Sequence, residues 1–290
     1  MPNPWILAAR PKTLPAAVAP VLVGTALAVR SGPIDLPVFG ATLATAVLLQ
    51  IGANFANDVF DFLKGADKDR IGPTRVTQSG LLSARQMLIG TAIVFIAATL
   101  LGIFLVAVGG LPIVVIGVCA ILAALAYTAG PFPLAYHGLG DAFAFLFFGV
   151  IAVSGTHLLQ TGTVDATTLL ASVPTALLVT NIIVVNNLRD IDTDRAANKR
   201  TLAVRIGDRR TRIEYVAFMG IAYLMPLLLW MFGFLASPGG LLAWISLPVG
   251  IALARDLWRT PRSPALNPIL GRTAQFNLLF SALFSVGLLL

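Results

Sequence analysis

The segment at residues 54–61 places amides and carboxylates at helical spacing. Asn54, Asp58 and Asp61 recur at intervals of four and three residues, and Asn57 stands four residues before Asp61. Side chains three or four residues apart lie on one face of a helix. A stripe of oxygen donors of this kind predicts a site that binds a cation, with Asn54 and Asn57 available to bind the substrate beside it.

A second segment, at residues 186–195, repeats the pattern. Asn186, Asp190 and Asp194 recur every four residues, and Asn187 adjoins the first of them. Amides inside an apolar helix are costly unless they have a partner. Two interpretations of Asn186 and Asn187 stay open: they bind substrate, or they hydrogen-bond to a neighbouring helix.

Two stripes of like charge repel each other, so we expect a positive group between them. Carboxylate oxygens suit Mg²⁺, which usually binds through one or two carboxylates together with substrate phosphates. We therefore predict catalytic Mg²⁺ ligands around a diphosphate, namely Asp58, Asp61, Asp190 and Asp194. Nearby cations could contact the remaining phosphate oxygens, and these are Lys12, Lys64, Lys68, Arg70, Arg75, Arg189 and Lys199. Among these cations, Lys64 and Arg189 are predicted to be catalytic.

The elements that must position these residues are membrane helices. The chain has 290 residues, of which 57% are hydrophobic and 11% charged, against roughly 25% charged in soluble domains. This composition excludes a water-soluble enzyme. Apolar stretches that could span a bilayer occur at nine places: Thr13–Val29, Pro37–Val59, Met87–Val108, Leu111–Thr128, Asp141–Gln160, Thr167–Asn187, Ile213–Phe234, Gly240–Arg255 and Ala274–Leu290.

The basic residues give an orientation. With nine spans, every Lys and Arg except Arg30 falls on the side that also holds the N-terminus and both acidic segments. Basic loops face the cytoplasm, so we expect this side to be the cytoplasmic face of the inner membrane. The basic excess then reflects topology and contact with membrane lipids, and no nucleic-acid partner is expected.

The acidic segments follow the second and the sixth predicted spans. This recurrence indicates an internal repeat. We predict an all-α polytopic membrane bundle that forms a single domain over residues 1–290. It would consist of two four-helix halves with a ninth helix appended.

The paired acidic motifs in a nine-span chain resemble the UbiA superfamily of intramembrane prenyltransferases. Segments between residues 10 and 205 resemble its naphthoate branch more closely, among them Arg10-Pro-Lys-Thr, Tyr127-Thr-Ala-Gly-Pro and Asn186-Asn-Leu-Arg-Asp190. The chain departs from that branch at Asp141, where Glu is expected, and at Asn198, where Gly is expected. The first departure keeps a carboxylate and the second lies in a loop.

The resemblance implies a Mg²⁺-dependent transferase of menaquinone biosynthesis. Polyprenyl diphosphate would prenylate 1,4-dihydroxy-2-naphthoate, with loss of CO₂ and diphosphate, to give demethylmenaquinone. The allylic cation must be kept from water, and aromatic faces can stabilise it. The candidate rings, for which core packing is the alternative role, are Phe60, Tyr127, Phe132, Tyr136 and Phe145.

The acceptor carboxylate needs a cationic or amide partner, for which Arg10, Lys12 and Asn187 are candidates. Asp141 either contacts the acceptor hydroxyl or caps the helix that begins there.

Two other functions stay open. The chain could use another aromatic acceptor such as 4-hydroxybenzoate, or it could be a secondary transporter, since transporters also combine repeats with intramembrane carboxylates. Carboxylates gathered at one end of the helices, rather than at the membrane midplane, favour the enzyme.

Overall fold

The computed structural model describes residues 3–65, 72–130 and 132–290, and the regular elements within these ranges are all helical. The N-terminal part contains α1 (Pro4–Ala9), η1 (Pro11–Thr13), α2 (Pro15–Val29), α3 (Leu36–Leu63), α4 (Ala84–Gly109) and α5 (Leu111–Ala126). The middle contains η2 (Leu134–His137), α6 (Gly140–Phe145), the π-helical η3 (Leu146–Ile151), α7 (Ala152–Thr161), α8 (Ala166–Arg189), α9 (Ile191–Ala196) and α10 (Leu202–Ile206). The C-terminal part contains α11 (Asp208–Met231), η4 (Pro238–Ser246), α12 (Leu247–Arg259) and α13 (Leu266–Leu288).

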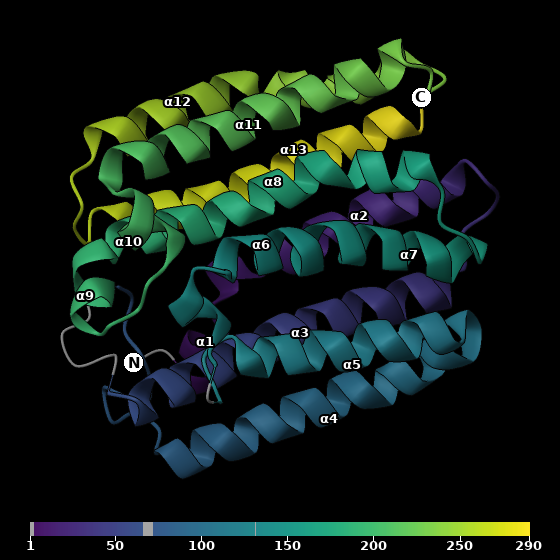
Figure 1. The fold of residues 1–290 in the computed structure, drawn as a ribbon. Helices are drawn as coiled ribbons and strands as arrows, with labels where there is room; N and C mark the ends of the chain where they lie inside the picture. Colours follow the sequence, from purple (N-terminus) through teal and green to yellow (C-terminus); the bar gives the residue numbers. More distant parts are fainter. Residues whose placement is uncertain (1–2, 66–71, 131) are drawn as a thin grey trace.

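The long helices lie side by side in one bundle, with α4 and α12 on opposite sides (Figure 1). The short helices α1, α9 and α10 gather at one end of it, where α3 and α8 also finish. We call this the site end. The C-terminus lies at the other end.

The all-α membrane bundle predicted from the sequence is confirmed, whereas the count of nine spans is not. Seven of the described helices or helix runs are long and apolar enough to cross a membrane, and the bent pair Pro4–Thr13 and Pro15–Val29 raises this to eight if it counts as one span. Helix α5 is apolar but short. Membrane helices tolerate bends and short segments where neighbours cover their backbone, so the difference between the predicted count and this one lies in the bent pair and in α5.

Several boundaries differ from the predicted ones. Helix α3 continues to Leu63 instead of ending at Val59, so the first acidic stripe is helical throughout. The eighth predicted span is the 3₁₀ segment η4 followed by α12, and the ninth begins at Leu266 rather than at Ala274. Polar residues at the ends of these helices hide the boundaries from a hydropathy argument.

The last helix joins the two halves instead of flanking them. Helix α13 packs against α2 of the N-terminal part and against α8 of the middle part. Its buried rings Phe276, Phe280 and Phe284 contribute to the largest apolar core, and Tyr223 of α11 meets Phe280 edge to face. This packing fixes α8, which carries the second acidic segment, relative to the N-terminal helices.

Candidate active site

A cavity of about 640 Å³ lies between the helices and reaches the site end. Its charged and amide lining residues are Arg10, Gln50, Asn54, Asn57, Asp61, Arg75, Asn186, Asn187, Asp190, Asp194 and Lys199. Apart from Tyr127 and several threonines the rest is apolar, and it includes Ile103 of α4, Ile113 of α5 and Phe147 of η3. A cavity with a charged end and an apolar remainder fits a ligand with an anionic head and a hydrocarbon tail.

Asp61, in the last turn of α3, lies between two cations. Its Oδ2 accepts a hydrogen bond from the Arg75 guanidinium at 2.9 Å, and its Oδ1 accepts one from Lys199 Nζ at 3.0 Å. All three side chains are buried. Buried charges are costly unless paired, so the two cations stabilise a carboxylate that faces the cavity.

Asp58 has a different environment, although it belongs to the same predicted stripe. Its two carboxylate oxygens accept the backbone N–H groups of Val76 and Thr77, at 3.0 and 2.9 Å, and the residue is 1% exposed. Asp58 does not line the cavity. One turn of α3 therefore directs Asp61 to the cavity and Asp58 to the loop that follows, which gives the metal role predicted for Asp58 no support in this arrangement.

Asp190 sits where α8 ends, and Arg189 beside it holds its carboxylate with two hydrogen bonds. Arg189 Nε donates to Oδ1 at 2.7 Å and an η nitrogen donates to Oδ2 at 2.5 Å. The guanidinium also donates to Asn186 at 2.8 Å and to Asn267 of α13 at 2.7 Å. Arg189 is fully enclosed and does not line the cavity, and its bonds fix the orientation of the Asp190 carboxylate.

Asp194 reaches the same cavity one turn later. The amide of Asp190 donates to the Asn186 carbonyl and that of Asp194 to the Asp190 carbonyl, so the four-residue register runs through the junction of α8 and α9. Asn186, Asp190 and Asp194 all line the cavity. The single face predicted from their spacing is confirmed.

The loop after α9 brings Lys199 back to the site. The Lys199 amide donates to the Asp194 carbonyl at 2.7 Å, and Asn198 adopts a left-handed φ of 57°. Asn tolerates this conformation better than most residues, which explains how Asn198 stands where Gly was expected. The same turn aims Lys199 Nζ at Asp61.

Tyr136 of η2 lies beside two ammonium groups. Lys64 Nζ is 5.1 Å and Lys199 Nζ 4.8 Å from the centre of its ring, distances typical of cation–π contacts. Burial lowers the pKa of Lys64, the Lys199 charge lowers it further, and the Asp61 carboxylate opposes both effects. Lys64 also donates to the Gly130 carbonyl at 3.3 Å and does not line the cavity, and neither does Tyr136.

The amides predicted to bind substrate have protein partners as well. Asn54 donates to the Ala9 carbonyl, and Asn57 accepts from the Thr128 hydroxyl at 3.2 Å. Asn187 donates to Asp141 at 3.5 Å. Among the described residues these bonds join neighbouring elements, while all three amides still line the cavity. Their positions are therefore compatible both with substrate binding and with hydrogen bonding to a neighbouring helix.

Other predicted residues divide into three groups. Arg10 and Tyr127 line the cavity. Lys12 is exposed and, like Asp141, does not line it, although Asp141 is buried against Asn187 at the start of α6. The predicted residues Lys68 and Arg70 lie outside the described residues.

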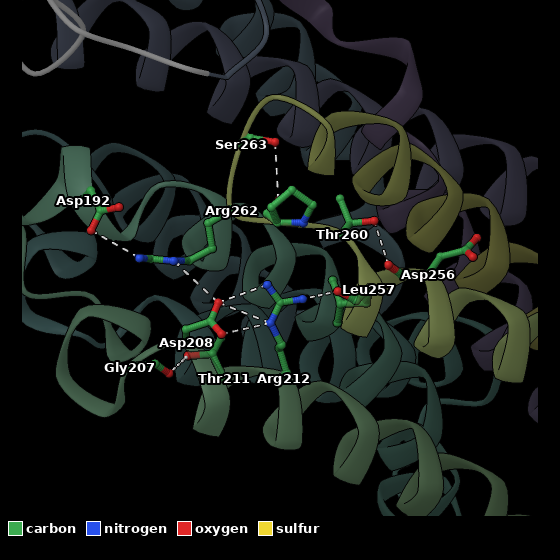
Figure 2. Close-up of polar contacts among 11 residues, drawn as sticks. Asp192, Gly207, Asp208, Thr211, Arg212, Asp256, Leu257, Thr260, Arg262 and Ser263 are labelled. Atoms are coloured by element: carbon green, nitrogen blue, oxygen red, sulfur yellow. Dashed lines mark hydrogen bonds and ion pairs between the residues drawn. The ribbon is translucent and has the colours of Figure 1, made fainter.

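Sequence reasoning missed the partners that position the second acidic segment. Asn267 of α13 accepts a hydrogen bond from Arg189. The sequence feature that could have indicated this role is the position of Asn267, a polar residue, within an apolar stretch. Farther out, Arg262 joins Asp192 of α9 at 3.1 Å to Asp208 of α11 at 3.6 Å (Figure 2). Arg212 also pairs with Asp208 and donates to the Leu257 carbonyl of α12. Asp192 thus faces this ionic cluster.

The donor set fits Mg²⁺ bound together with a phosphate ligand. Within the described residues no three His, Cys, Asp or Glu side chains are close enough to form a preformed metal centre. Mg²⁺ does not require such a cage, because it keeps several waters and shares one or two carboxylates with substrate phosphates. Asp61, Asp190 and Asp194 face one cavity with oxygen donors and could hold it.

Comparison with known proteins assigns the chain to a family. The UbiA prenyltransferase family matches residues 17–280 of this chain. A 1,4-dihydroxy-2-naphthoate octaprenyltransferase of Escherichia coli is 39% identical, covering 99% of this chain and 95% of its own, and one of Haemophilus influenzae is 36% identical, covering 99% and 96%.

A solved UbiA homologue from Archaeoglobus fulgidus, bound to DMAPP and Mg²⁺, shares the fold. Its TM-score is 0.65 at 15% identity, and the match covers 97% of this chain and 99% of that one. The family match spans most of the chain, the two relatives cover nearly all of it, and the fold agrees. The chain belongs to the UbiA prenyltransferase family.

Proposed function

We propose that this protein transfers a polyprenyl group from polyprenyl diphosphate to 1,4-dihydroxy-2-naphthoate, releasing diphosphate and CO₂ and producing the demethylmenaquinone skeleton. No electrons are removed in this substitution, so its immediate product is the quinol form. The observation that carries the proposal is the cavity with a charged end and an apolar remainder. Two relatives that match over nearly their full length are named for this acceptor, which supports its choice.

The charged end suits the diphosphate. Arg10, Arg75 and Lys199 supply cations around it, and Asp61, Asp190 and Asp194 would hold Mg²⁺ there. Bound Mg²⁺ would stabilise the charge that develops on the leaving diphosphate. The named Archaeoglobus homologue binds DMAPP and Mg²⁺, which supports the same requirement here.

Arg75 and Lys199 have a second task in this proposal. Both donate to Asp61, so this buried carboxylate has two charged partners within the protein. When the diphosphate enters, its oxygens compete for the same donors. Charge-assisted hydrogen bonds are strong and directional, so the cations can pass from Asp61 to the leaving group while Asp61 turns to the metal.

The apolar lining protects the reacting carbon. Breakage of the allylic C–O bond leaves a cation that water would capture. Phe143, Phe147 and Phe148 line the cavity beyond its charged end, and Tyr127 lies on the same lining. Aromatic faces stabilise a desolvated cation by roughly 1–2 kcal/mol each. These rings could therefore favour ionisation and also direct the cation to the aromatic acceptor.

The acceptor is placed near Arg10 and Asn187 in this proposal. Both line the cavity, and a guanidinium or an amide N–H can bind the naphthoate carboxylate. Asn187 also donates to Asp141, which holds the amide in a fixed orientation. Lys12, exposed and off the cavity, is a weaker candidate for this contact.

We also propose that the site end faces the cytoplasm in the inner membrane. Nearly all Lys and Arg residues fall on the predicted inner side, with Arg30 as the exception. The positive-inside rule supports this orientation. Labelling of a single cysteine introduced at Arg85 or at Arg30 in intact cells, after Cys119 is replaced by Ala, tests it: a membrane-impermeant reagent should reach only the residue 30 position.

The function is tested with purified protein in detergent, Mg²⁺, a defined polyprenyl diphosphate and either 1,4-dihydroxy-2-naphthoate or 4-hydroxybenzoate. Mass spectrometry should find a prenylated, decarboxylated naphthalene product with the first acceptor only. Prenylated 4-hydroxybenzoate in its place would contradict the proposed acceptor. Failure to form any prenylated aromatic, with folded protein, would contradict the proposed chemistry.

A further inference from the structure

A second cavity, away from the site described above, lies between α11 and α12. Its volume is about 470 Å³, and its lining is apolar for most of its length, with Val216 and Tyr223 from α11 and Ile251 from α12. Residues spaced three or four apart on each helix contribute, so the groove follows the two helices lengthwise. Its apolar lining suits a hydrocarbon chain.

The end of this groove is basic. Arg255 and Arg259 of α12 line it one helical turn apart, with Trp258 between them in the sequence. All three are exposed, Trp258 at 45%. Helix α12 finishes at the site end, so these groups lie where the helices leave the membrane. Trp and Arg are the side chains that favour this depth.

Residues next to Arg255 and Arg259 hold α12 against its neighbours, but the two arginines take no part in these contacts. Asp256 pairs with Arg272 of α13 at 2.5 Å, and the Leu257 carbonyl accepts from Arg212 of α11 (Figure 2). Within the described part of the chain, the side chains of Arg255 and Arg259 make no ion pair and no hydrogen bond. Their charges are therefore available to an anion at the mouth of the groove.

A glycine on the lining leaves space in the groove. A Cβ built on Gly220 of α11 meets no atom within 4 Å, and Gly220 lines the groove. A larger side chain there would fill the groove without displacing the helices around it. The space is therefore a hollow on the outer surface and not a packing contact between α11 and α12.

We propose that this groove binds an anionic phospholipid, with the headgroup phosphate on Arg255 and Arg259 and an acyl chain lying over Gly220. Charge complementarity supports this occupant, because basic pockets between membrane helices attract anionic headgroups near the bilayer surface. A free phosphate would leave the apolar part of the groove unfilled, whereas a phospholipid would occupy both parts. A zwitterionic headgroup would bring its own ammonium group close to the two arginines, and these like charges would repel.

The test measures lipid binding without reference to enzyme activity. Delipidated wild-type protein in detergent is titrated with phosphatidylglycerol or phosphatidylcholine, and bound lipid is counted by native mass spectrometry. Arg255→Gln/Arg259→Gln should lower the affinity for phosphatidylglycerol about tenfold. Gly220→Leu should lower it by filling the groove. Phosphatidylcholine should bind wild type no better than it binds the double variant.

Matched variants control for general effects. Arg85→Gln removes an exposed arginine on α4, on the opposite side of the bundle, and Gly40→Leu fills open space on α3. Both should bind phosphatidylglycerol like wild type, and all variants should melt at the wild-type temperature without lipid. Equal affinity of wild type and the double variant, equal binding of both lipids to wild type, or full displacement of the lipid by millimolar inorganic phosphate would each overturn the proposal.

Discussion

Lys199 Nζ donates to Asp61 Oδ1 at 3.0 Å, and this bond joins the end of α3 to the loop between α9 and α10. The two residues stand 138 positions apart in the chain. Through this contact each acidic segment supplies one partner of a buried ion pair: the first provides the carboxylate, and the loop after the second provides the ammonium. The charged end of the cavity is thus assembled from both halves of the protein.

Replacing Lys199 by Met should weaken binding of the diphosphate more than it weakens the fold. Asp61 keeps Arg75, so its carboxylate stays paired, but one charge-assisted hydrogen bond to substrate is lost. Such a bond is worth about 1.5–3 kcal/mol, which corresponds to roughly a ten- to hundredfold rise in KM for polyprenyl diphosphate. Steady-state kinetics in detergent measures it. Lys199→Arg should recover part of the loss, and an unchanged KM would remove Lys199 from the diphosphate site.

Replacing Asp61 by Asn should affect both stability and catalysis. The variant removes the carboxylate shared by Arg75 and Lys199, and breaking a buried pair in this way costs about 3–5 kcal/mol. Loss of a Mg²⁺ ligand should lower kcat/KM by roughly a thousandfold. Thermal melting and product formation are measured on the same preparation.

Asp192→Asn is the control for the Asp61 variant. Asp192 lies on α9 near the second segment, but its side chain is 66% exposed and pairs with Arg262. Exposed pairs of this kind contribute about 0–1 kcal/mol. Activity and melting temperature should therefore stay near wild type. A comparable loss in both variants would mean that charge near the site end, and not the position of Asp61, is what matters.

The sequence predicted the helical bundle and most of the cavity's polar lining because both follow from local spacing. Asn186, Asp190 and Asp194 needed only a helical register to share a face, and they do. The role of Asp58 could not be predicted in this way. Its spacing is equally helical, but its carboxylate accepts the backbone N–H groups of Val76 and Thr77, and the path of that loop is a tertiary feature.

The same limit explains Arg189 and the number of spans. Arg189 was predicted to be catalytic from its place beside Asp190, whereas its enclosure depends on Asn267 of α13, a helix whose start hydropathy missed. The count of nine spans stays unconfirmed because α5 is short and α2 forms part of a bent pair. Contacts between distant helices decide both outcomes, and single-sequence periodicity contains no information on them.

Replacing Arg189 by Lys should lower activity through the position of Asp190. Lysine keeps the charge but cannot reproduce the two parallel bonds to the carboxylate together with those to Asn186 and Asn267. We expect kcat to fall about tenfold or more while KM for the diphosphate changes little, since a misplaced metal ligand affects the reacting geometry. Asn267→Ala should produce a smaller fall of the same kind. A rise in KM alone would instead indicate direct contact between Arg189 and the substrate.

Asp165, at the other end of the bundle, should make part of the protein's free energy of unfolding depend on pH. Its carboxylate accepts hydrogen bonds from the Thr168 hydroxyl at 2.6 Å and from the Thr168 amide at 2.7 Å. Both bonds lower the pKa of Asp165, and the bond from the hydroxyl has the larger effect. A lowered folded-state pKa means that the stabilisation is present above the ordinary value of 3.8 and is lost as pH falls through the folded value.

Asp165→Ala should therefore destabilise the protein at neutral pH by about 1 kcal/mol, the usual cost of a lost N-cap. The difference from wild type should shrink below pH 4. Asp165→Ser is the matched control, because it keeps a cap without a titrating carboxyl: the stability gap between Asp165→Ser and Asp165→Ala should not change with pH, whereas both gaps to wild type should shrink as the pH falls. Melting temperatures in detergent across this range measure the effect, and a pH-independent gap for Asp165→Ala would refute the titration argument.

Asp58 and Asp61, one helical turn apart, should differ most clearly in their dependence on Mg²⁺. Asp58 binds two backbone N–H groups and does not line the cavity, whereas Asp61 faces it. Asp58→Asn keeps one acceptor oxygen and places an NH₂ group against a backbone donor, so it should lower stability by about 1–3 kcal/mol. Below its melting temperature, the Mg²⁺ concentration for half-maximal activity should equal that of wild type.

The residual activity of Asp61→Asn should instead require more Mg²⁺, since it lacks a carboxylate that faces the metal and the diphosphate. Titrating Mg²⁺ at saturating polyprenyl diphosphate separates the two roles, because a loss of folded protein lowers the maximum of the curve without moving its midpoint. If the midpoint of Asp58→Asn moves as far as that of Asp61→Asn, Asp58 must leave the 76–77 loop and bind the metal when substrate is present.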